Sequence, residues 1–146
     1  MIRTYSAAET RERGKALAAL LRAGDVILLE GELGAGKSEL ARGIARGLGV
    51  RETVTSPSFT ILNVYESGRL PLYHFDWYRL ESEEELYELG MDEYLGGDGV
   101  ALVEWPEQCP DAVPEDCLRI RITADGENTR HIEAESCGGF RMISLE

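Results

Sequence analysis

The sequence contains no long apolar stretch, and this absence limits where the protein is expected to work. No run of apolar residues approaches the roughly 18 that a membrane-spanning helix needs. Residues 1–5 (MIRTY) lead into a polar stretch and lack the apolar centre of a signal peptide. We therefore expect a cytoplasmic protein with no membrane partner.

Cysteine is also scarce. The chain has three cysteines, Cys109, Cys117 and Cys137, which is an odd number without a C-x-x-C pair. This spacing indicates neither a disulfide framework nor a zinc site. We expect reduced thiols with mostly structural roles, because a cytoplasmic environment keeps cysteines reduced.

Positive charge is the third property in short supply. Fifteen Lys and Arg residues stand against 27 Asp and Glu residues, giving a net charge of −12. Such a surface repels phosphate backbones and gains little from counterion release. We expect no direct DNA binding, and a nucleic-acid substrate would be held by a partner. Solubility alone explains the acidity equally well.

The length and the order of the expected elements indicate one α/β domain over residues 1–146. A chain of 146 residues, 43% hydrophobic and 29% charged, fits one globular core. An S-x-x-E capping box at 6–9 and another at 82–85 predict helix starts. Further helix is expected at 37–48, buried strands at 25–30 and 100–105, and extended segments at 53–67, 70–80, 118–123, 130–135 and 140–145.

The loop between the first buried strand and the next helix carries the most specific motif. Residues 31–38 (GELGAGKS) match G-x-x-x-x-G-K-[ST], whose backbone N–H groups surround a β-phosphate. Lys37, one of two lysines in the chain, would reach the β- and γ-phosphates, and the Ser38 hydroxyl would bind Mg²⁺. The nucleotide-binding candidates are Gly31, Gly34, Ala35, Gly36, Lys37, Ser38 and Glu39.

This motif fixes the expected fold more closely. We predict a P-loop NTPase-like three-layer sandwich, with a mostly parallel central sheet and antiparallel strands contributed late in the chain. The sequence lacks N-K-x-D, the guanine-reading motif of GTPases, so ATP is the favoured nucleotide.

Two strand-end carboxylates are candidates for the chemistry of the site. Glu104 ends the apolar run 100–103 in the manner of a Walker B strand, and Asp76 ends the extended segment before it. Either can hold Mg²⁺ or orient the attacking water, and solvated acids at strand ends are the ordinary alternative. His74 is either an active-site group or a packed side chain, and Trp105 either stacks on a base or fills the core.

Together these residues resemble the TsaE (YjeE) family, the bacterial ATPases of tRNA threonylcarbamoyladenosine biosynthesis. The matching positions are Glu9, Thr10 and Gly14; the loop 31–38; residues 55–59 (TSPSF) and 73–80 (YHFDWYRL); Leu89-Gly90 with Tyr94-Leu95; residues 104–107 (EWPE); and Arg130. Two positions depart from the family pattern, because Ser38 and Ser58 replace threonines. Both keep the hydroxyl, so modest effects on affinity are expected.

The resemblance implies a role for each site residue and for partners. Lys37, Asp76 and Glu104 would be catalytic, with Ser38 and Glu104 at the metal. Further nucleotide contacts are implied for Thr10, Ser58, Trp105 and Arg130. The ATPase would be weak alone, would act with TsaB and TsaD, which contact the tRNA, and would power turnover of that complex.

Two other functions fit the loop motif. A small-metabolite kinase is the first, although no Arg-rich lid cluster follows the loop. The second is a nucleotide-dependent binding switch with negligible hydrolysis, which differs from the ATPase only in turnover.

Overall fold

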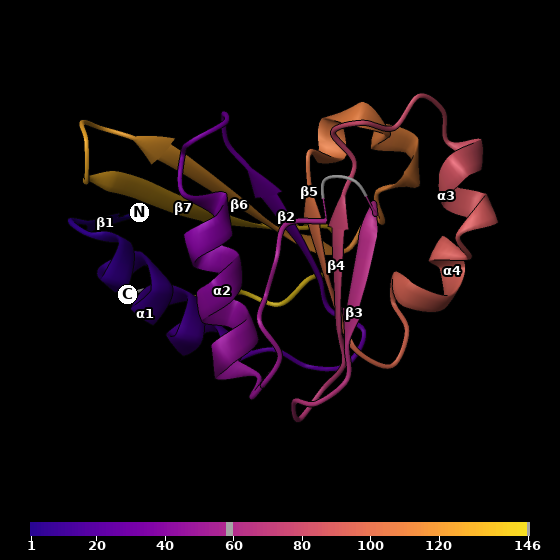
Figure 1. Ribbon diagram of the computed structural model, residues 1–146, viewed down its shortest axis with the longest axis horizontal. Coiled ribbons are helices and arrows are strands. Elements are labelled where there is room, and N and C mark those ends of the chain that lie inside the picture. Colours follow the sequence, from indigo (N-terminus) through magenta and orange to yellow (C-terminus); the bar gives the residue numbers. More distant parts are fainter. Residues whose placement is uncertain (58–59, 146) are drawn as a thin grey trace.

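The computed structural model describes residues 1–57 and 60–145, which form a sheet with helices on both sides (Figure 1). No helix in this part of the chain is long and apolar enough to span a membrane. The elements are β1 (Ile2–Thr4), α1 (Ala7–Ala18), β2 (Val26–Glu30), α2 (Lys37–Gly47), β3 (Leu62–Tyr65), β4 (Leu72–Asp76), α3 (Glu84–Glu88), α4 (Met91–Tyr94), β5 (Val100–Glu104), two short 3₁₀ turns (Pro106–Gln108 and Pro110–Ala112), β6 (Cys117–Ala124) and β7 (Arg130–Cys137).

The strands form one sheet in the order β1-β7-β6-β2-β5-β4-β3. The four central strands β6, β2, β5 and β4 are parallel, whereas β7, β1 and β3 pair antiparallel at the edges. The predicted parallel centre with a late antiparallel strand is therefore confirmed. The edge strand β1 was not predicted, and β3, which lies in the extended segment expected at 53–67, is antiparallel although antiparallel strands were expected late in the chain.

Alternate residues of the central strands serve different layers. In β2, Ile27 and Leu29 join the apolar cluster beneath α1 and α2, while Val26 and Leu28 join the cluster beneath α3 and α4. This alternation follows the two-residue period of a strand. Figure 1 shows α1 and α2 on one side of the sheet and α3 and α4 on the other, so the predicted three-layer sandwich is confirmed.

Helices α1 and α2 pack closely because glycines occupy their interface. A Cβ added to Gly14 would lie 2.5 Å from the Leu40 carbonyl oxygen, and one added to Gly43 would collide with the Arg11 carbonyl. Gly47 meets α1 in the same way, at the Lys15 carbonyl. The side chains that flank these glycines on the two helices are consequently brought together at the surface.

The two predicted capping boxes have different outcomes. The Ser6 Oγ accepts a hydrogen bond from the Glu9 N–H at 3.1 Å and begins α1 as expected. The prediction at Ser82 is wrong, because α3 begins at Glu84 with no side-chain cap. The Glu85 carboxylate instead accepts a hydrogen bond from the N–H of Glu81, a residue that lies before the helix.

The predicted strand at 140–145 is also wrong. Residues 140–145 form no strand, and three of their apolar side chains pack against the α1–α2 cluster. The Arg141 guanidinium bonds both Asp25 oxygens, at 2.9 and 2.7 Å, and the Leu20 carbonyl. These side-chain contacts hold the segment against the α1–α2 cluster and not along β7, although β1 covers only Arg130–Ile132 of that strand.

Candidate nucleotide-binding site

The loop between β2 and α2 has the backbone geometry that an anion-binding loop requires. Gly34 and Gly36 have φ angles of 81° and 107°, which favour glycine over residues with a Cβ. Gly36 is the N-cap of α2, and because glycine has no side chain it leaves the first helical N–H groups uncapped. These N–H groups and the positive end of the helix dipole therefore favour an anion at this position.

A cleft of about 320 Å³ lies over this loop and gathers most of the predicted site. It opens at the carboxyl ends of β2, β4 and β5, where ligands bind in parallel α/β sheets. Its lining consists of Leu33, Gly34, Gly36, Lys37, Ser38, Glu39, Ser56, Asp76, Glu104, Trp105 and Arg130. Gly31 and Ala35 instead line a neighbouring hollow formed with the end of β6.

Lys37 places a buried cation in the cleft. The residue is 6% exposed, and its Nζ has no hydrogen-bond partner among the described residues. The Nζ lies 3.6 Å from the centroid of the Trp105 ring, a cation–π contact. Burial lowers the pKa of Lys37, while the nearby Glu104, Asp76 and Glu107 carboxylates oppose this shift. An ammonium with unmet donors fits an anionic ligand.

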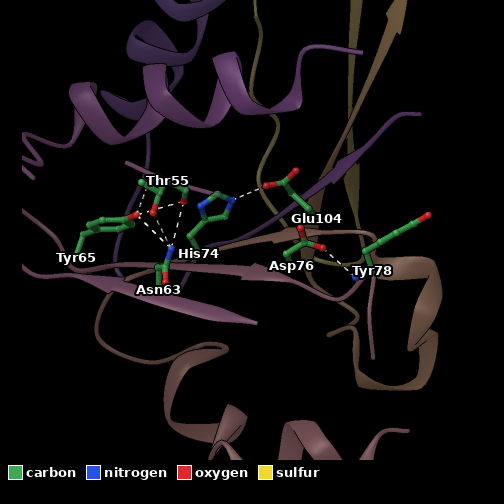
Figure 2. A network of polar contacts seen from close by, with 7 residues as sticks. All are labelled: Thr55, Asn63, Tyr65, His74, Asp76, Tyr78 and Glu104. Carbon is green, nitrogen blue, oxygen red and sulfur yellow. Dashed lines mark hydrogen bonds and ion pairs between the residues drawn. The ribbon is translucent and has the colours of Figure 1, made fainter. Parts of the chain in front are cut away.

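The two predicted carboxylates lie side by side. Asp76 and Glu104 are the last residues of β4 and β5 and are direct neighbours in the parallel register. Both residues are buried, and the Asp76 Oδ1 accepts a hydrogen bond from the Tyr78 N–H at 2.9 Å (Figure 2). The structure thus brings Lys37, Asp76 and Glu104 together from three separate segments.

His74 is bonded directly to one of these acids. Its Nε2 lies 2.6 Å from the Glu104 Oε2, and the two side chains are 3% and 7% exposed. The Nδ1 is buried without a hydrogen-bond partner in the described part of the chain. Figure 2 shows the ring between Glu104 and a cluster in which the Asn63 amide donates to the Thr55 carbonyl. The sequence signal for this role is the two-residue spacing to Asp76, which places both side chains on one strand face.

Trp105 has an unusual backbone for its size. Its φ and ψ are 58° and 49°, in the left-handed region that bulky residues rarely adopt. The half-buried ring lines the cleft beneath the Lys37 ammonium and contacts the Tyr78 ring at 4.8 Å between centroids. The ring also packs against the apolar cluster beneath α3 and α4, so it both lines the cleft and adds to the core, and its stacking on a base stays a prediction.

The remaining predicted residues lie in different places. Arg130 lines the cleft, and its guanidinium donates to the Gly34 carbonyl at 3.5 Å. Thr10 does not line it, because this residue is 2% exposed and shares a 2.7 Å hydrogen bond with the Thr4 hydroxyl. Its contact with a nucleotide stays a prediction. Ser58 lies outside the described residues.

The part of the chain that the structure describes contains no group of three or more His, Cys, Asp or Glu side chains arranged for a metal ion. Mg²⁺ commonly takes only one or two protein ligands and completes its shell with phosphate oxygens and water. The Ser38 hydroxyl and the Glu104 carboxylate, which line one cleft, are a donor set that fits this chemistry.

Comparisons with known proteins identify a family. A sequence model of the family described as threonylcarbamoyl adenosine biosynthesis protein TsaE matches residues 4–132. A Bacillus subtilis (strain 168) relative, tRNA threonylcarbamoyladenosine biosynthesis protein TsaE, is 46% identical over 145 residues, covering 99% of this chain and 90% of the relative.

Two further comparisons point to the same family. The Streptomyces coelicolor (strain ATCC BAA-471 / A3(2) / M145) protein of that name is 47% identical over 137 residues, covering 88% of this chain and 90% of the relative. The crystal structure of Bacillus subtilis YdiB superposes with a TM-score of 0.82 at 42% identity, covering 94% of this chain and 84% of YdiB. With the family model matching most of its length, the chain belongs to the TsaE family.

Proposed function

We propose that this protein is a Mg²⁺-dependent ATPase subunit required for the threonylcarbamoyladenosine modification of tRNA. The observation that carries the ATPase assignment is the buried, unpartnered Lys37 ammonium between the glycine loop and two strand-end acids. The names of the TsaE relatives support the tRNA pathway, because these proteins are described by this biosynthesis.

Each residue of the cleft would have a separate role in binding or hydrolysing ATP. The backbone N–H groups around Gly36 hold the phosphates, and Lys37 leaves the Trp105 ring to bind the β- and γ-phosphate oxygens. Ser38 and Glu104 would hold Mg²⁺, which supplies neutralising charge for the phosphates. Asp76 orients the attacking water. His74 fixes the Glu104 carboxylate through the 2.6 Å contact.

The other contacts position the nucleotide outside the phosphates. Arg130, at the start of β7, and Trp105, directly after β5, line the cleft and offer a cation and an aromatic face to the nucleotide. Ser56 lines the same cleft from the segment that carries Ser58. We propose that this segment contacts the γ-phosphate and so distinguishes ATP from ADP.

Partners complete the proposed function. We propose that the protein acts with TsaB and TsaD, that they hold the tRNA, and that ATP hydrolysis powers turnover of the complex. The net charge of −12 supports this division, because an acidic chain repels RNA at long range. A cytoplasmic location stays a prediction.

The nucleotide assignment is tested by calorimetric titration of ATP with Mg²⁺. Lys37→Ala removes the ammonium and is expected to abolish detectable binding, while Arg22→Ala, at an exposed position away from the cleft, binds as the unchanged protein does. Unchanged affinity in Lys37→Ala removes the ATPase assignment.

The pathway and the reaction need separate measurements. Cells depleted of the protein are expected to lose threonylcarbamoyladenosine from their tRNA, and Lys37→Ala is expected not to restore it. ATPase assays with and without TsaB and TsaD are expected to show stimulation and to release free phosphate. A phosphorylated metabolite would instead identify a kinase, and normal nucleoside levels in depleted cells would remove the pathway assignment.

A further inference from the structure

The charges of this acidic protein are unevenly distributed along the chain. Residues 1–51 contain nine Lys or Arg and six Asp or Glu, a net charge of +3, whereas residues 52–146 carry a net charge of −15. The positive part includes α1 and α2, which cover the same face of the sheet (Figure 1). Helix α1 carries three cations and two acids and α2 three cations and one acid, so the two helices together have a net charge of +3 in a molecule that is strongly acidic as a whole.

A groove of about 410 Å³ runs along this face, between α1, α2 and the segment after α2. The described residues that line it are Arg11, Glu12, Lys15, Arg42, Gly43, Arg46, Thr53 and Val54. Four of these eight are cations and one is an acid. Gly43 contributes to the floor, where the close approach of the two helices leaves no room for a Cβ.

Two of the four cations are paired with an acid among the described residues and two are not. One guanidinium nitrogen of Arg11 contacts one oxygen of the Glu39 carboxylate, and one of Arg42 contacts the other oxygen at 2.6 Å. Lys15 and Arg46 form no ion pair with any described residue, and both are exposed. The groove therefore binds one carboxylate of its own chain and presents two further cations without an anion.

The groove is also connected to the nucleotide cleft. Glu39, which bonds the two arginines, itself lines the cleft. Thr53 and Val54 line the groove and lead directly into the segment whose Ser56 lines the cleft. A ligand in the groove would thus contact Thr53 and Val54, just before the cleft residue Ser56. It would also compete with the cleft residue Glu39 for Arg11 and Arg42.

We propose that this groove docks an acidic segment, rich in Asp and Glu, of a protein partner. Guanidinium groups form charge-assisted hydrogen bonds with carboxylates, and two arginines of the groove, Arg11 and Arg42, already bind the Glu39 carboxylate in this way. A short acidic segment fits better than RNA, because the −15 charge of residues 52–146 repels a long polyanion. The identity of the partner as TsaB or TsaD rests on the proposed function.

The test reverses the two unpaired cations in the full chain. The double variant Lys15→Glu, Arg46→Glu is compared with Arg3→Glu, Arg22→Glu, which makes the same charge change at exposed positions outside the groove. Affinity for the purified TsaB–TsaD pair is measured at several salt concentrations. The groove variant is expected to bind at least about tenfold more weakly with a shallower salt dependence, and the control variant within about twofold of the unchanged protein.

Additional measurements separate the possible failures. Both variants are expected to bind ATP as the unchanged protein does. If the unchanged protein itself does not bind ATP, that result contradicts the proposed function and not the groove. If the unchanged chain does not bind TsaB–TsaD, a Glu-rich peptide is titrated, and binding that the groove variant loses supports the groove alone. The proposal is overturned if both double variants lose equal affinity or neither loses any, or if the unchanged protein binds neither the TsaB–TsaD pair nor the peptide. It is also overturned if the groove variant changes only the binding of added tRNA.

Discussion

At the scale of single residues, His74 determines how Glu104 presents its carboxylate. The 2.6 Å contact through Nε2 is buried, so it holds the acid in one orientation without competition from water. Side chains that orient a metal ligand typically change metal affinity by about 10- to 100-fold when they are replaced. The role of His74 can therefore be separated from simple packing.

Two substitutions of His74 distinguish its nitrogens. In His74→Gln the amide nitrogen lies near the position of Nε2 and can still donate to Glu104, whereas in His74→Asn it lies near Nδ1 and cannot. We expect Asn to weaken Mg²⁺-dependent ATP binding about tenfold and Gln to retain most of it. Calorimetric titrations with and without Mg²⁺ measure this. Equal losses in both variants, or the same losses without Mg²⁺, would contradict it.

The burial of Lys37 predicts how ATP binding depends on pH. Burial lowers its pKa from the ordinary 10.5, so the neutral amine forms at a lower pH than on an exposed lysine. Because the phosphates need the ammonium, we expect ATP affinity to fall as the pH rises through the alkaline range below 10.5. Titrations between pH 7 and pH 10 measure the fall, with circular dichroism confirming the fold. A constant affinity up to pH 10 would show that Lys37 remains charged throughout.

At the scale of the elements, the contact between α1 and α2 depends on glycine. In an exposed helix, Gly→Ala would gain about 1 kcal/mol from helix propensity. At Gly43 the new methyl would meet the Arg11 carbonyl, and overpacking typically costs about 1–3 kcal/mol, occasionally more. Because the new Cβ would overlap that carbonyl oxygen, we take the upper end of the cost, about 3 kcal/mol, and subtract the gain of about 1 kcal/mol, so Gly43→Ala is expected to lower the free energy of unfolding by about 2 kcal/mol in urea titrations. Ala16→Gly, at an exposed position of α1, calibrates propensity, and a net gain in Gly43→Ala would disprove the tight contact.

The elements also show what the sequence could and could not reveal. Periodicity and the loop motif predicted β2, α2 and β5 closely, because each depends on local patterns. The segment 140–145 has an alternating pattern but forms no strand, because its apolar side chains pack against the α1–α2 cluster and Arg141 bonds Asp25, and a local pattern does not reveal such distant contacts. The His74–Glu104 contact likewise follows from β4 lying next to β5, and strand order is not a local property.

At the scale of the whole molecule, one ion pair ties the end of the chain to the start of the central strand β2. The Arg141 side chain is 28% exposed and Asp25 8%, and two hydrogen bonds join them. Loss of the arginine leaves a largely buried carboxylate without its cation, although the Arg22 N–H still donates to it at 2.7 Å. Breaking a fully buried pair costs about 3–5 kcal/mol, so we expect about 2 kcal/mol for this partly exposed one.

Urea unfolding of Arg141→Ala measures this contribution. Arg22→Ala removes a nearby exposed arginine and is expected to change the free energy of unfolding by less than about 0.5 kcal/mol. If the two variants have the same stability, the C-terminal segment adds little to the fold. If Arg141→Ala alone is destabilised, residues 140–145 are part of the folded core although they form no strand.

The contact between Lys37 and Trp105 has an optical consequence. The chain has only two tryptophans, and Trp77 is fully buried against Phe75. The indole of Trp105 has an ammonium 3.6 Å from its centre, and the ammonium belongs to the group proposed to move onto phosphate. Nucleotide entry would therefore alter the fluorescence emission of a single residue, so that the unlabelled protein carries its own reporter of an occupied cleft.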